Sequence, residues 1–331
     1  MSEGSFVVVH ISETYIVLVI VHSGHYLDAA RAAERQSIHI RIQYTLLSQS
    51  IHIRRLILRS AIASEALDAY VICKKEYDTE TAEFYCILQY LFYKQWFELK
   101  KYVNSLGIRI IGDLPIYVAH DSAEVWGSPQ YFELNSQKKP VNVAGVPPDG
   151  FSSEGQLWGN PVYDWEYLKS EGFEWWIKRI SHALTVCDII RIDHFRGFSS
   201  YYSVPYGSIN AVNGMWRKAP GAELFKAVEK RIGKANIIAE DLGFIDDDVK
   251  SLLRETGFPG MKILQFAFDS REESDYLPHN YGRNCVVYIG THDNDTLMGW
   301  HDNTASDSDK AHAWSYCHIT PEEGFNWGII R

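Results

Sequence analysis

Apolar residues recur every three or four positions in the stretch that begins near Thr81. The positions that share this spacing are Phe84, Ile87, Leu88, Leu91, Phe92, Trp96 and Leu99. Residues spaced in this way lie on one face of an α-helix. Gly107 follows, and glycine commonly ends helices because it adopts a left-handed backbone. The pattern therefore predicts an amphipathic helix that ends before Gly107.

Short, nearly continuous apolar runs alternate with further amphipathic stretches after this helix. The first run, 108–118, is rich in isoleucine and contains Asp113. The same patterns predict helices over 173–184, 221–232 and 246–256, and strands over 187–193, 236–240, 261–268 and 285–291. Continuous apolar strands are typical of a parallel sheet that is covered on both faces. The alternation predicts an α/β fold, and it leaves both a closed barrel and an open doubly wound sheet as alternatives.

Two segments fall outside this alternation. Residues 1–80 contain short β-branched runs and a near-repeat, QSIHIR at Gln36 and again at Gln49, to which we assign no chemistry. They fit a small appendage, a divergent piece of barrel or an extension. The stretch from Ala119 to Tyr163 is rich in Gly, Pro, Trp and Asp. We expect a long loop there, over the carboxyl ends of the strands, because loops of this length are usually functional.

The composition narrows the class of protein. Of the 331 residues, 46% are hydrophobic and 22% are charged, which is enough apolar material for a sizeable core. The formal net charge of −10 argues against nucleic acid as a partner, because phosphate-binding proteins usually display clustered Lys and Arg. The 20 tyrosines and 10 tryptophans offer flat rings that can stack on sugars, although we expect most of them in the core.

The cysteines and the N-terminal residues indicate in which cellular compartment the protein is expected. The five cysteines are far apart, with no CxxC pair: Cys73, Cys86, Cys187, Cys285 and Cys317. They predict reduced thiols in a cytoplasmic protein. The apolar stretch from Ile16 to Val21 is too short to cross a bilayer, and the opening residues lack the positive charge of a secretory signal. We expect neither membrane insertion nor export.

Acidic residues follow four of the predicted strands. They are Asp113, Asp193, the pair Glu240 and Asp241, and Asp293. A single acid after a strand is more often a helix cap, but four converge on one mouth if the strands form an α/β barrel. Cleavage of a glycosidic bond needs a proton donor and a carboxylate, which such a ring supplies. With no HExxH, HxH or calcium-loop spacing, a metallohydrolase is the weaker alternative, and we expect no metal and no cofactor.

Arg191 and Asp193 lie two residues apart on a predicted strand, so both side chains point to the same face. An adjacent guanidinium favours the anionic form of a carboxylate and fixes its direction, which suits a nucleophile. A purely structural ion pair is the alternative interpretation. His194 follows, and its imidazole fits equally a donor to a sugar hydroxyl and a partner of loop carbonyls.

Glu240 and Asp293 suit other parts of the same chemistry. Glu240 ends an apolar strand beside Asp241. An apolar environment and a negatively charged neighbour both favour the protonated form of the Glu240 carboxyl, as a general acid requires. His292 and Asp293 are placed to bind adjacent sugar hydroxyls, and Asp295 to cap the next helix.

Several longer motifs resemble those of one family. The chain contains GDLPIYVAHDSAEVW, AGVPPDGFS, GQLWGNPVYDW, RIDHFRGF, IIAEDLG, GFPGMKILQFAFD, LPHNY and GTHDNDT. They resemble successive motifs of the 4-α-glucanotransferases, in that family's order and at its approximate spacing, from about Phe84 to Arg331. The resemblance implies a (β/α)₈ TIM-type barrel, incomplete here, with the first strands divergent or absent and the last strand missing. It implies a divergent segment over 1–80 and the catalytic barrel region over 81–331.

The resemblance also implies a reaction and its residues. The expected activity moves segments of maltooligosaccharides or other α-1,4-glucans from a donor to an acceptor with retention, and the alternatives are a non-catalytic glucan-binding relative or an inactive fragment. Asp193 would be the nucleophile, Glu240 the acid/base and Asp293 the residue that stabilises the transition state. The residues that would contact the substrate are Asp113, Arg191, His292, Phe151, Trp158 and Phe266. The last three are aromatic, and each also fits the role of a loop anchor.

Overall fold

The computed structural model describes residues 5–11, 16–21, 79–149, 152–243, 245–269, 271 and 274–331. The chain divides into two compact units: the first comprises residues 1–237 and 245–256, and the second comprises 238–244 and 257–331. Most of the divergent N-terminal segment, including both copies of QSIHIR, lies outside the described residues, as does Phe151.

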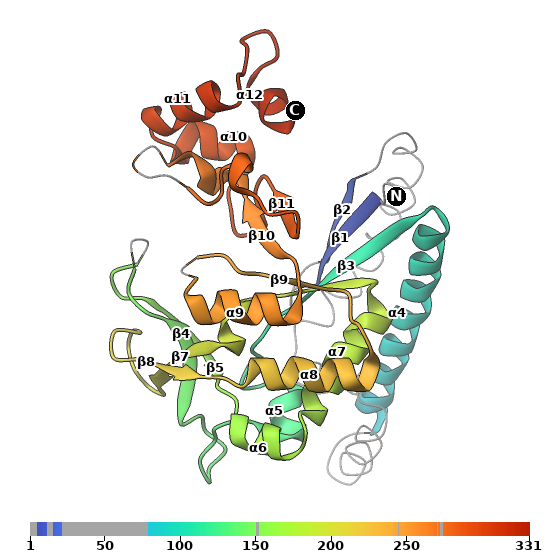
Figure 1. Ribbon diagram of the computed structural model, residues 1–331. Coiled ribbons are helices and arrows are strands. Elements are labelled where there is room, and N and C mark those ends of the chain that lie inside the picture. The colour runs from blue at the N-terminus through green and yellow to red at the C-terminus, as the bar shows by residue number, and fades with distance from the viewer. Residues whose placement is uncertain are drawn as a thin grey trace. The chain divides into compact units, whose positions relative to one another are not determined.

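A mainly parallel sheet forms the centre of the first unit (Figure 1). Its strand order is β2-β1-β3-β6-β9. The strands are β1 (Ser5–Ile11), β2 (Ile16–Val21), β3 (Ile108–Leu114), β6 (Ile189–Ile192) and β9 (Ile237–Ala239), the last of which runs from the first unit into the second. β3 pairs in parallel with both β1 and β6, whereas β2 is antiparallel to β1. Parallel pairing brings the carboxyl ends of β3 and β6 to the same edge.

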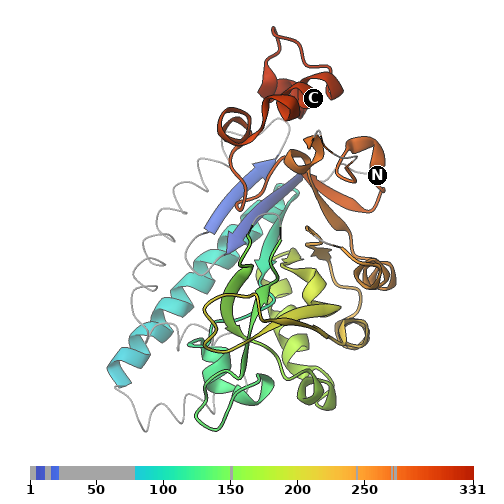
Figure 2. The same cartoon turned by 90° about the vertical axis from the view of Figure 1, so that its left-hand side faces the viewer.

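The predicted helices are present at nearly the predicted positions. They are α4 (Thr79–Ser105), α7 (Glu174–Val186), α8 (Gly221–Ile232) and α9 (Asp247–Thr256). Gly107 has a φ of +76°, the left-handed conformation expected after a helix. α4 packs beside β3 (Figure 2), and its buried Trp96 donates a hydrogen bond from Nε1 to the Val186 carbonyl at 2.9 Å. α4 is thus held against β3 and against the end of α7 by its apolar face.

The stretch from Ala119 to Tyr163 is not the long loop that its composition predicts. It contains α5 (Ala123–Gly127), the 3₁₀ turn η2 (Pro129–Tyr131), β4 (Asn142–Val146) and β5 (Gln156–Pro161), and α6 (Trp165–Ser170) follows. β4 and β5 join β7 (Ser200–Pro205) and β8 (Met215–Lys218) in an antiparallel sheet of order β5-β4-β7-β8. Strands this short, with glycine and proline inside them, show no clear period in sequence, which is why the prediction failed.

The second unit is built around two short parallel strands, β10 (Gly260–Ile263) and β11 (Cys285–Tyr288). Both end earlier than the runs 261–268 and 285–291 predict. After β10 the chain turns directly into the 3₁₀ helix η4 (Leu264–Phe268). The remaining elements are η5 (Pro278–Asn280), α10 (Leu297–Gly299), the π-helix η6 (Trp300–Thr304), α11 (Asp307–Tyr316) and α12 (Phe325–Ile330). Their core gathers apolar side chains that include Phe268, Trp300 and Phe325.

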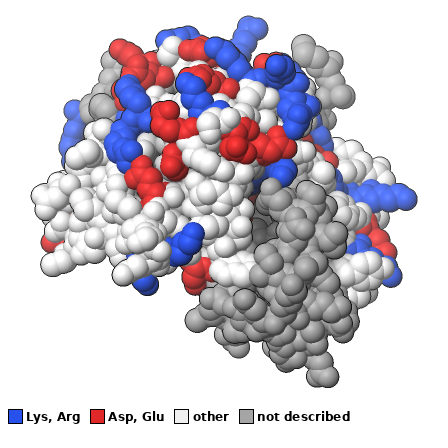
Figure 3. Space-filling view, turned by 90° about the horizontal axis from the view of Figure 1, so that it is seen from below, with Lys and Arg blue, Asp and Glu red and all other residues white. Residues whose placement is uncertain are grey.

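The surface of the described part is mixed in charge. Exposed ion pairs such as Lys169–Glu223 and Arg231–Glu174 join neighbouring helices, and Figure 3 shows positive and negative side chains interspersed on the face seen from below. Within the described ranges, no helix combines the length and apolar character that crossing a membrane requires. The same residues hold no cluster of three or more His, Cys, Asp or Glu side chains suited to a metal ion.

Candidate active site

Arg191 links two carboxylates at the carboxyl edge of the parallel sheet. The register of β3 and β6 sets Asp113 directly opposite Arg191, and Arg191 Nη1 lies 2.6 Å from Asp113 Oδ1. The other guanidinium nitrogen, Nη2, lies 2.9 Å from Oδ1 of Asp193, the residue that follows β6. The side chains of Arg191 and Asp113 are 12% and 11% exposed, whereas that of Asp193 is 40% exposed.

This geometry confirms the prediction that Arg191 and Asp193 share one face. Because Arg191 is held on one side by Asp113, its second nitrogen has a fixed direction towards Asp193. The half-exposed carboxylate of Asp193 therefore has a fixed direction, and the guanidinium that it shares with Asp113 compensates part of its charge while it stays open to a ligand.

His194 follows Asp193 in a left-handed conformation, with a φ of 49°. Its ring meets the edge of Trp158, from β5, with 4.8 Å between centroids and an interplanar angle of 87°. Burial lowers the pKa of His194 to about 4, against the opposing charge of Asp193. The imidazole is therefore neutral near pH 7. It offers one N–H donor and one acceptor beside the Asp193 carboxylate.

Trp158, one of the predicted aromatic contacts, lies on β5 and is partly exposed. Its ring is 37% exposed, is tilted against Tyr117 at 6.2 Å, and donates from Nε1 to Gln156 Oε1 at 3.1 Å. The ring is supported by Tyr117 and His194 and still accessible to solvent, which is the arrangement that a stacking surface for a sugar needs.

Arg196 anchors the turn that carries Asp193 and His194. It is buried in η3 (Phe195–Phe198), its Nη2 lies 2.5 Å from Asp246 Oδ2, and its guanidinium carbon lies 4.0 Å from the Trp216 ring centroid. Partial burial raises the pKa of Asp246, but the hydrogen bond from Arg196 leaves it below its usual value. Arg196 is not among the site residues predicted from the sequence. An arginine three residues after the candidate nucleophile, in an otherwise apolar turn, is the signal that could have found it.

Within the second unit, Glu240 follows β9 and is buried, with 9% of its surface exposed. Its Oε1 accepts a hydrogen bond from the Leu242 amide at 2.7 Å. The neighbouring Asp241 accepts from the Met261 amide at 2.6 Å, and burial raises its pKa although that hydrogen bond opposes the shift. Glu240 is thus buried, as predicted for an acid/base. That its carboxyl is protonated stays a prediction.

His292 and Asp293 lie side by side after β11, with 3.3 Å between His292 Nε2 and Asp293 Oδ1. Their side chains are open to solvent, 39% and 69% exposed. The prediction that Asp295 caps the next helix is wrong. The side chain of Thr296 accepts the hydrogen bond from the Gly299 amide and caps α10, and Asp295 Oδ1 instead accepts from the Thr296 amide at 2.8 Å.

Phe266 belongs to η4 and not to a strand, which corrects the sequence prediction. Its exposed ring contacts the edge of Tyr276 at 5.6 Å. The preceding residue, Gln265, donates from Nε2 to the Asp295 carbonyl at 2.9 Å, so η4 is tied to the segment that bears His292. Phe151, the remaining predicted contact, lies outside the described residues.

The fold and these side chains define a class: an α/β protein with carboxylates at the carboxyl ends of parallel strands and accessible aromatic rings in the same segments. Carboxylates accept hydrogen bonds from hydroxyl groups and repel phosphate, so each of these segments taken by itself suits a neutral ligand rich in hydroxyls.

Comparison with known proteins identifies the family. A family model described as 4-alpha-glucanotransferase matches residues 58–331. The chain is 52% identical over 253 residues to a 4-alpha-glucanotransferase of Clostridium butyricum, covering 76% of this chain and 52% of that protein. It is 49% identical over 253 residues to one of Thermus thermophilus, with 76% and 49% covered. The chain belongs to the 4-alpha-glucanotransferase family.

A solved structure agrees with this assignment. The amylomaltase from Streptococcus agalactiae in complex with acarbose superimposes with a TM-score of 0.76 at 38% identity, covering 94% of this chain and 68% of that one. The chain spans about half the length of the curated relatives it matches.

Proposed function

We propose that this chain carries the active-site half of a 4-α-glucanotransferase, which moves α-1,4-glucan segments from a donor to an acceptor glucan or glucose with retention. The observation that carries the proposal is the Asp113–Arg191–Asp193 array, in which a half-exposed carboxylate is aimed by an arginine that a second carboxylate holds in place. Membership of the family supports the choice of substrate class.

The proposed reaction has two displacements. In the first, an Asp193 oxygen attacks the anomeric carbon while Glu240 gives its proton to the glycosidic oxygen, so the donor's reducing-end portion leaves and a covalent glycosyl-enzyme forms. In the second, the 4-hydroxyl of an acceptor sugar attacks the same carbon, returns its proton to Glu240 and releases Asp193. The scheme requires the two carboxyl groups to be about 5–5.5 Å apart.

The other predicted residues hold the sugar in this scheme. Asp293 and His292 bind hydroxyls of the reacting glucose unit, and charge on Asp293 favours the positive charge that grows at the anomeric carbon. Transfer instead of hydrolysis requires the acceptor to be oriented better than water. Stacking on Trp158, Phe151 and Phe266 provides that orientation, and Asp113 and Arg191 fix the remaining hydroxyls.

The architecture and setting are part of the same proposal. The parallel strand order supports a (β/α)₈ barrel, incomplete in this chain, with a catalytic region over 81–331 and a divergent segment over 1–80. The scheme uses no metal and no cofactor. Its partners are maltooligosaccharides or other α-1,4-glucans, without nucleic acid or membrane, in the cytoplasm.

Incubation of the purified chain with maltotriose tests the proposal. Glucose together with maltooligosaccharides longer than maltotriose is the expected result, because each turnover moves a segment to another acceptor. Binding of maltotriose or acarbose without products would indicate a non-catalytic glucan-binding relative instead. Release of glucose with no longer products would indicate hydrolysis.

Substitution of Asp193 by asparagine separates the chemistry from the fold. Asp193→Asn keeps the shape of the side chain and removes the nucleophile, so transfer should fall by at least about 10³-fold while the denaturation midpoint stays near that of the wild type. Asp248→Asn is the matched control, because Asp248 is an exposed partner of Lys218. Substantial transfer by Asp193→Asn would refute its role as nucleophile.

A further inference from the structure

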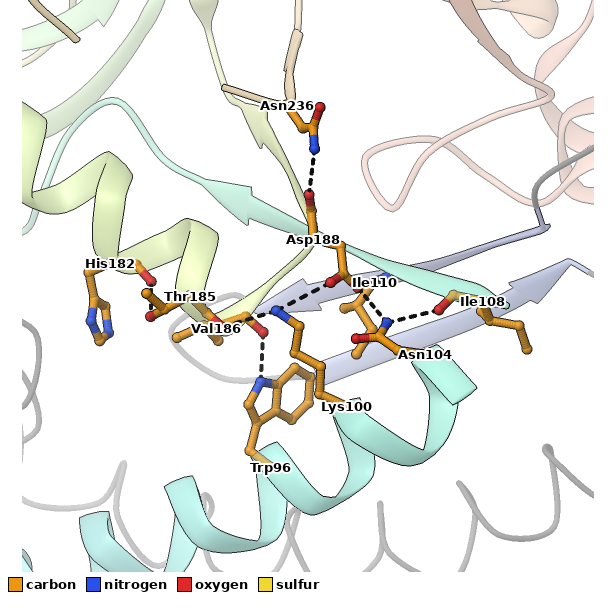
Figure 4. Close-up of polar contacts among 10 residues, drawn as sticks. All are labelled: Trp96, Lys100, Asn104, Ile108, Ile110, His182, Thr185, Val186, Asp188 and Asn236. Carbon is orange, nitrogen blue, oxygen red and sulfur yellow. Dashed lines mark hydrogen bonds and ion pairs between the residues drawn. The ribbon is translucent and has the colours of Figure 1, made fainter. Parts of the chain in front are cut away.

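Asp188 lies at the entry to β6 and contacts several elements of the first unit. Its Oδ2 accepts hydrogen bonds from the Ile110 amide and from Asn104 Nδ2, each at 2.8 Å, and its Oδ1 lies 3.3 Å from Lys100 Nζ. Its own amide donates to the Ile110 carbonyl at 2.9 Å. Figure 4 shows Lys100 and Asn104 reaching from α4 towards this carboxylate.

The double contact with Ile110 joins the entry of β6 to β3. Both the backbone amide and the side chain of Asp188 form hydrogen bonds with the backbone of Ile110. Three residues further along each strand, the same register places Arg191 opposite Asp113. Side chains alternate between the faces of a strand, so a slip by one residue would turn Arg191 to the other face. A slip by two would move it about 7 Å along the strand, beyond reach of Asp113.

The apolar residues of the two strands specify this register only weakly, because most of them are isoleucines, which are interchangeable in pairing. A second feature at the same place adds to the specification. Gly112 of β3 has no side chain, and the Sγ of Cys187 occupies the space where a Cβ at position 112 would lie. Cys187 is buried and precedes Asp188 directly. The fit of the Cys187 sulfur against Gly112 and the hydrogen bonds between Asp188 and Ile110 therefore favour the same register of β6 against β3.

A purely structural role for Asp188 would rest on its ion pair with Lys100, which fastens α4 to the sheet. Lys100 also donates to the Thr185 carbonyl at 3.0 Å, and Asn104 Nδ2 donates to the Ile108 carbonyl at 2.9 Å, so α4 keeps other polar contacts with its neighbours. The bond from the Ile110 amide is different in kind, because it joins β3 to the entry of β6 and not to α4.

We propose that Cys187 and Asp188 set the register between β3 and β6, and that Asp188 is thereby a positioning residue for the Arg191 and Asp193 side chains. The catalytic part of this inference rests on the proposed function. The consequence is a defect in bond cleavage, seen in kcat more than in KM, when the hydrogen bond to Ile110 is lost.

Three variants of the full chain distinguish a role of Asp188 in the register between β3 and β6 from a role in holding α4 through Lys100. Asp188→Ala removes the acceptor for Ile110, and we expect kcat for maltotriose to fall by about 10- to 100-fold, the size of effect that a misplacement near 1 Å produces. Asp188→Asn keeps an amide oxygen as acceptor and should restore most of this loss. Lys100→Met is the control: it removes the ion pair and keeps the Ile110 bond, so kcat should match that of the wild type.

Amide hydrogen exchange provides a readout that needs no activity. Peptides that cover 108–114 and 189–192 should lose protection in Asp188→Ala and keep it in Lys100→Met, in which only peptides of α4 and of the end of α7 exchange faster. Equal patterns in the two variants, or wild-type kcat and protection in Asp188→Ala, would overturn the proposal. If the wild type transfers no glucan segment but the strand-specific loss is seen, the proposed function fails and the register role stands.

A second pair of variants applies if Asp188→Ala does not fold. Gly112→Ala places a methyl group against the Cys187 sulfur and should lower both kcat and strand protection. Gly112→Ala with Cys187→Ala removes that sulfur and leaves only the Cβ of residue 187, 3.1 Å from the new methyl, so both quantities should recover in large part. A double variant no better than Gly112→Ala alone would overturn the proposal.

Discussion

Protonation of His194 should oppose folding in mildly acidic solution. Burial lowers the pKa of His194 to about 4, compared with 6.5 for a free histidine. Below pH 6.5 the unfolded chain therefore binds a proton that the folded chain does not, and the free energy of unfolding decreases as the pH falls. The loss is complete below pH 4, where both states are protonated.

The size of this effect follows from the two pKa values. Linkage between 6.5 and about 4 gives a loss of about 2 kcal/mol at pH 5 and about 3 kcal/mol at pH 4, and almost none at pH 7. A loss of that size is a large fraction of the stability of an ordinary domain, about 5–15 kcal/mol.

Urea unfolding of the wild type and of His194→Asn measures this contribution. Asparagine suits the left-handed backbone at position 194 and does not titrate in this range. Between pH 7 and pH 4 the wild type should lose about 3 kcal/mol more than the variant. His182, whose pKa burial also lowers, is present in both proteins, so its contribution cancels. Parallel curves of stability against pH for the two proteins would refute the reasoning.

Two further predictions concern binding and stability. Trp158→Ala should raise KM for maltotriose by roughly 10-fold, because a stacking surface for the sugar is lost. Trp126, on α5, is equally exposed, and Trp126→Ala should leave KM unchanged. Equal effects of the two substitutions in kinetic assays would argue against a stacking role. Arg196→Met should lower the free energy of unfolding by about 2–3 kcal/mol, because Asp246 loses the buried guanidinium with which it pairs. A denaturant midpoint equal to that of the wild type would contradict this prediction.

The local part of the site could be predicted from sequence, because it depends on periods that sequence displays. Arg191 and Asp193 share a face by the two-residue period of a strand, and their ion pair follows from that alone. The contact of Arg191 with Asp113 could not be predicted in the same way. It depends on β6 lying next to β3 in one register, and similar isoleucine-rich strands do not specify a neighbour.

Where local periods are absent, prediction failed. The contact between Trp158 and His194 depends on β4 and β5, which form in a segment whose glycines and prolines suggested a loop. Phe266 looked like a strand residue because most residues of 261–268 are apolar, but the chain tightens there into a 3₁₀ helix whose Gln265 donates to the Ile289 and Asp295 carbonyls. Both features are determined by tertiary contacts that override local preference.

Identification of the covalently modified residue tests the central claim most directly. Glu240→Gln should still be glycosylated by α-maltosyl fluoride, because fluoride leaves without a proton donor, but it should be slow to pass the sugar on. Mass spectrometry of its peptides should then find a maltosyl group on Asp193. A sugar attached to a different carboxylate, or a released product of inverted anomeric configuration, would contradict the account.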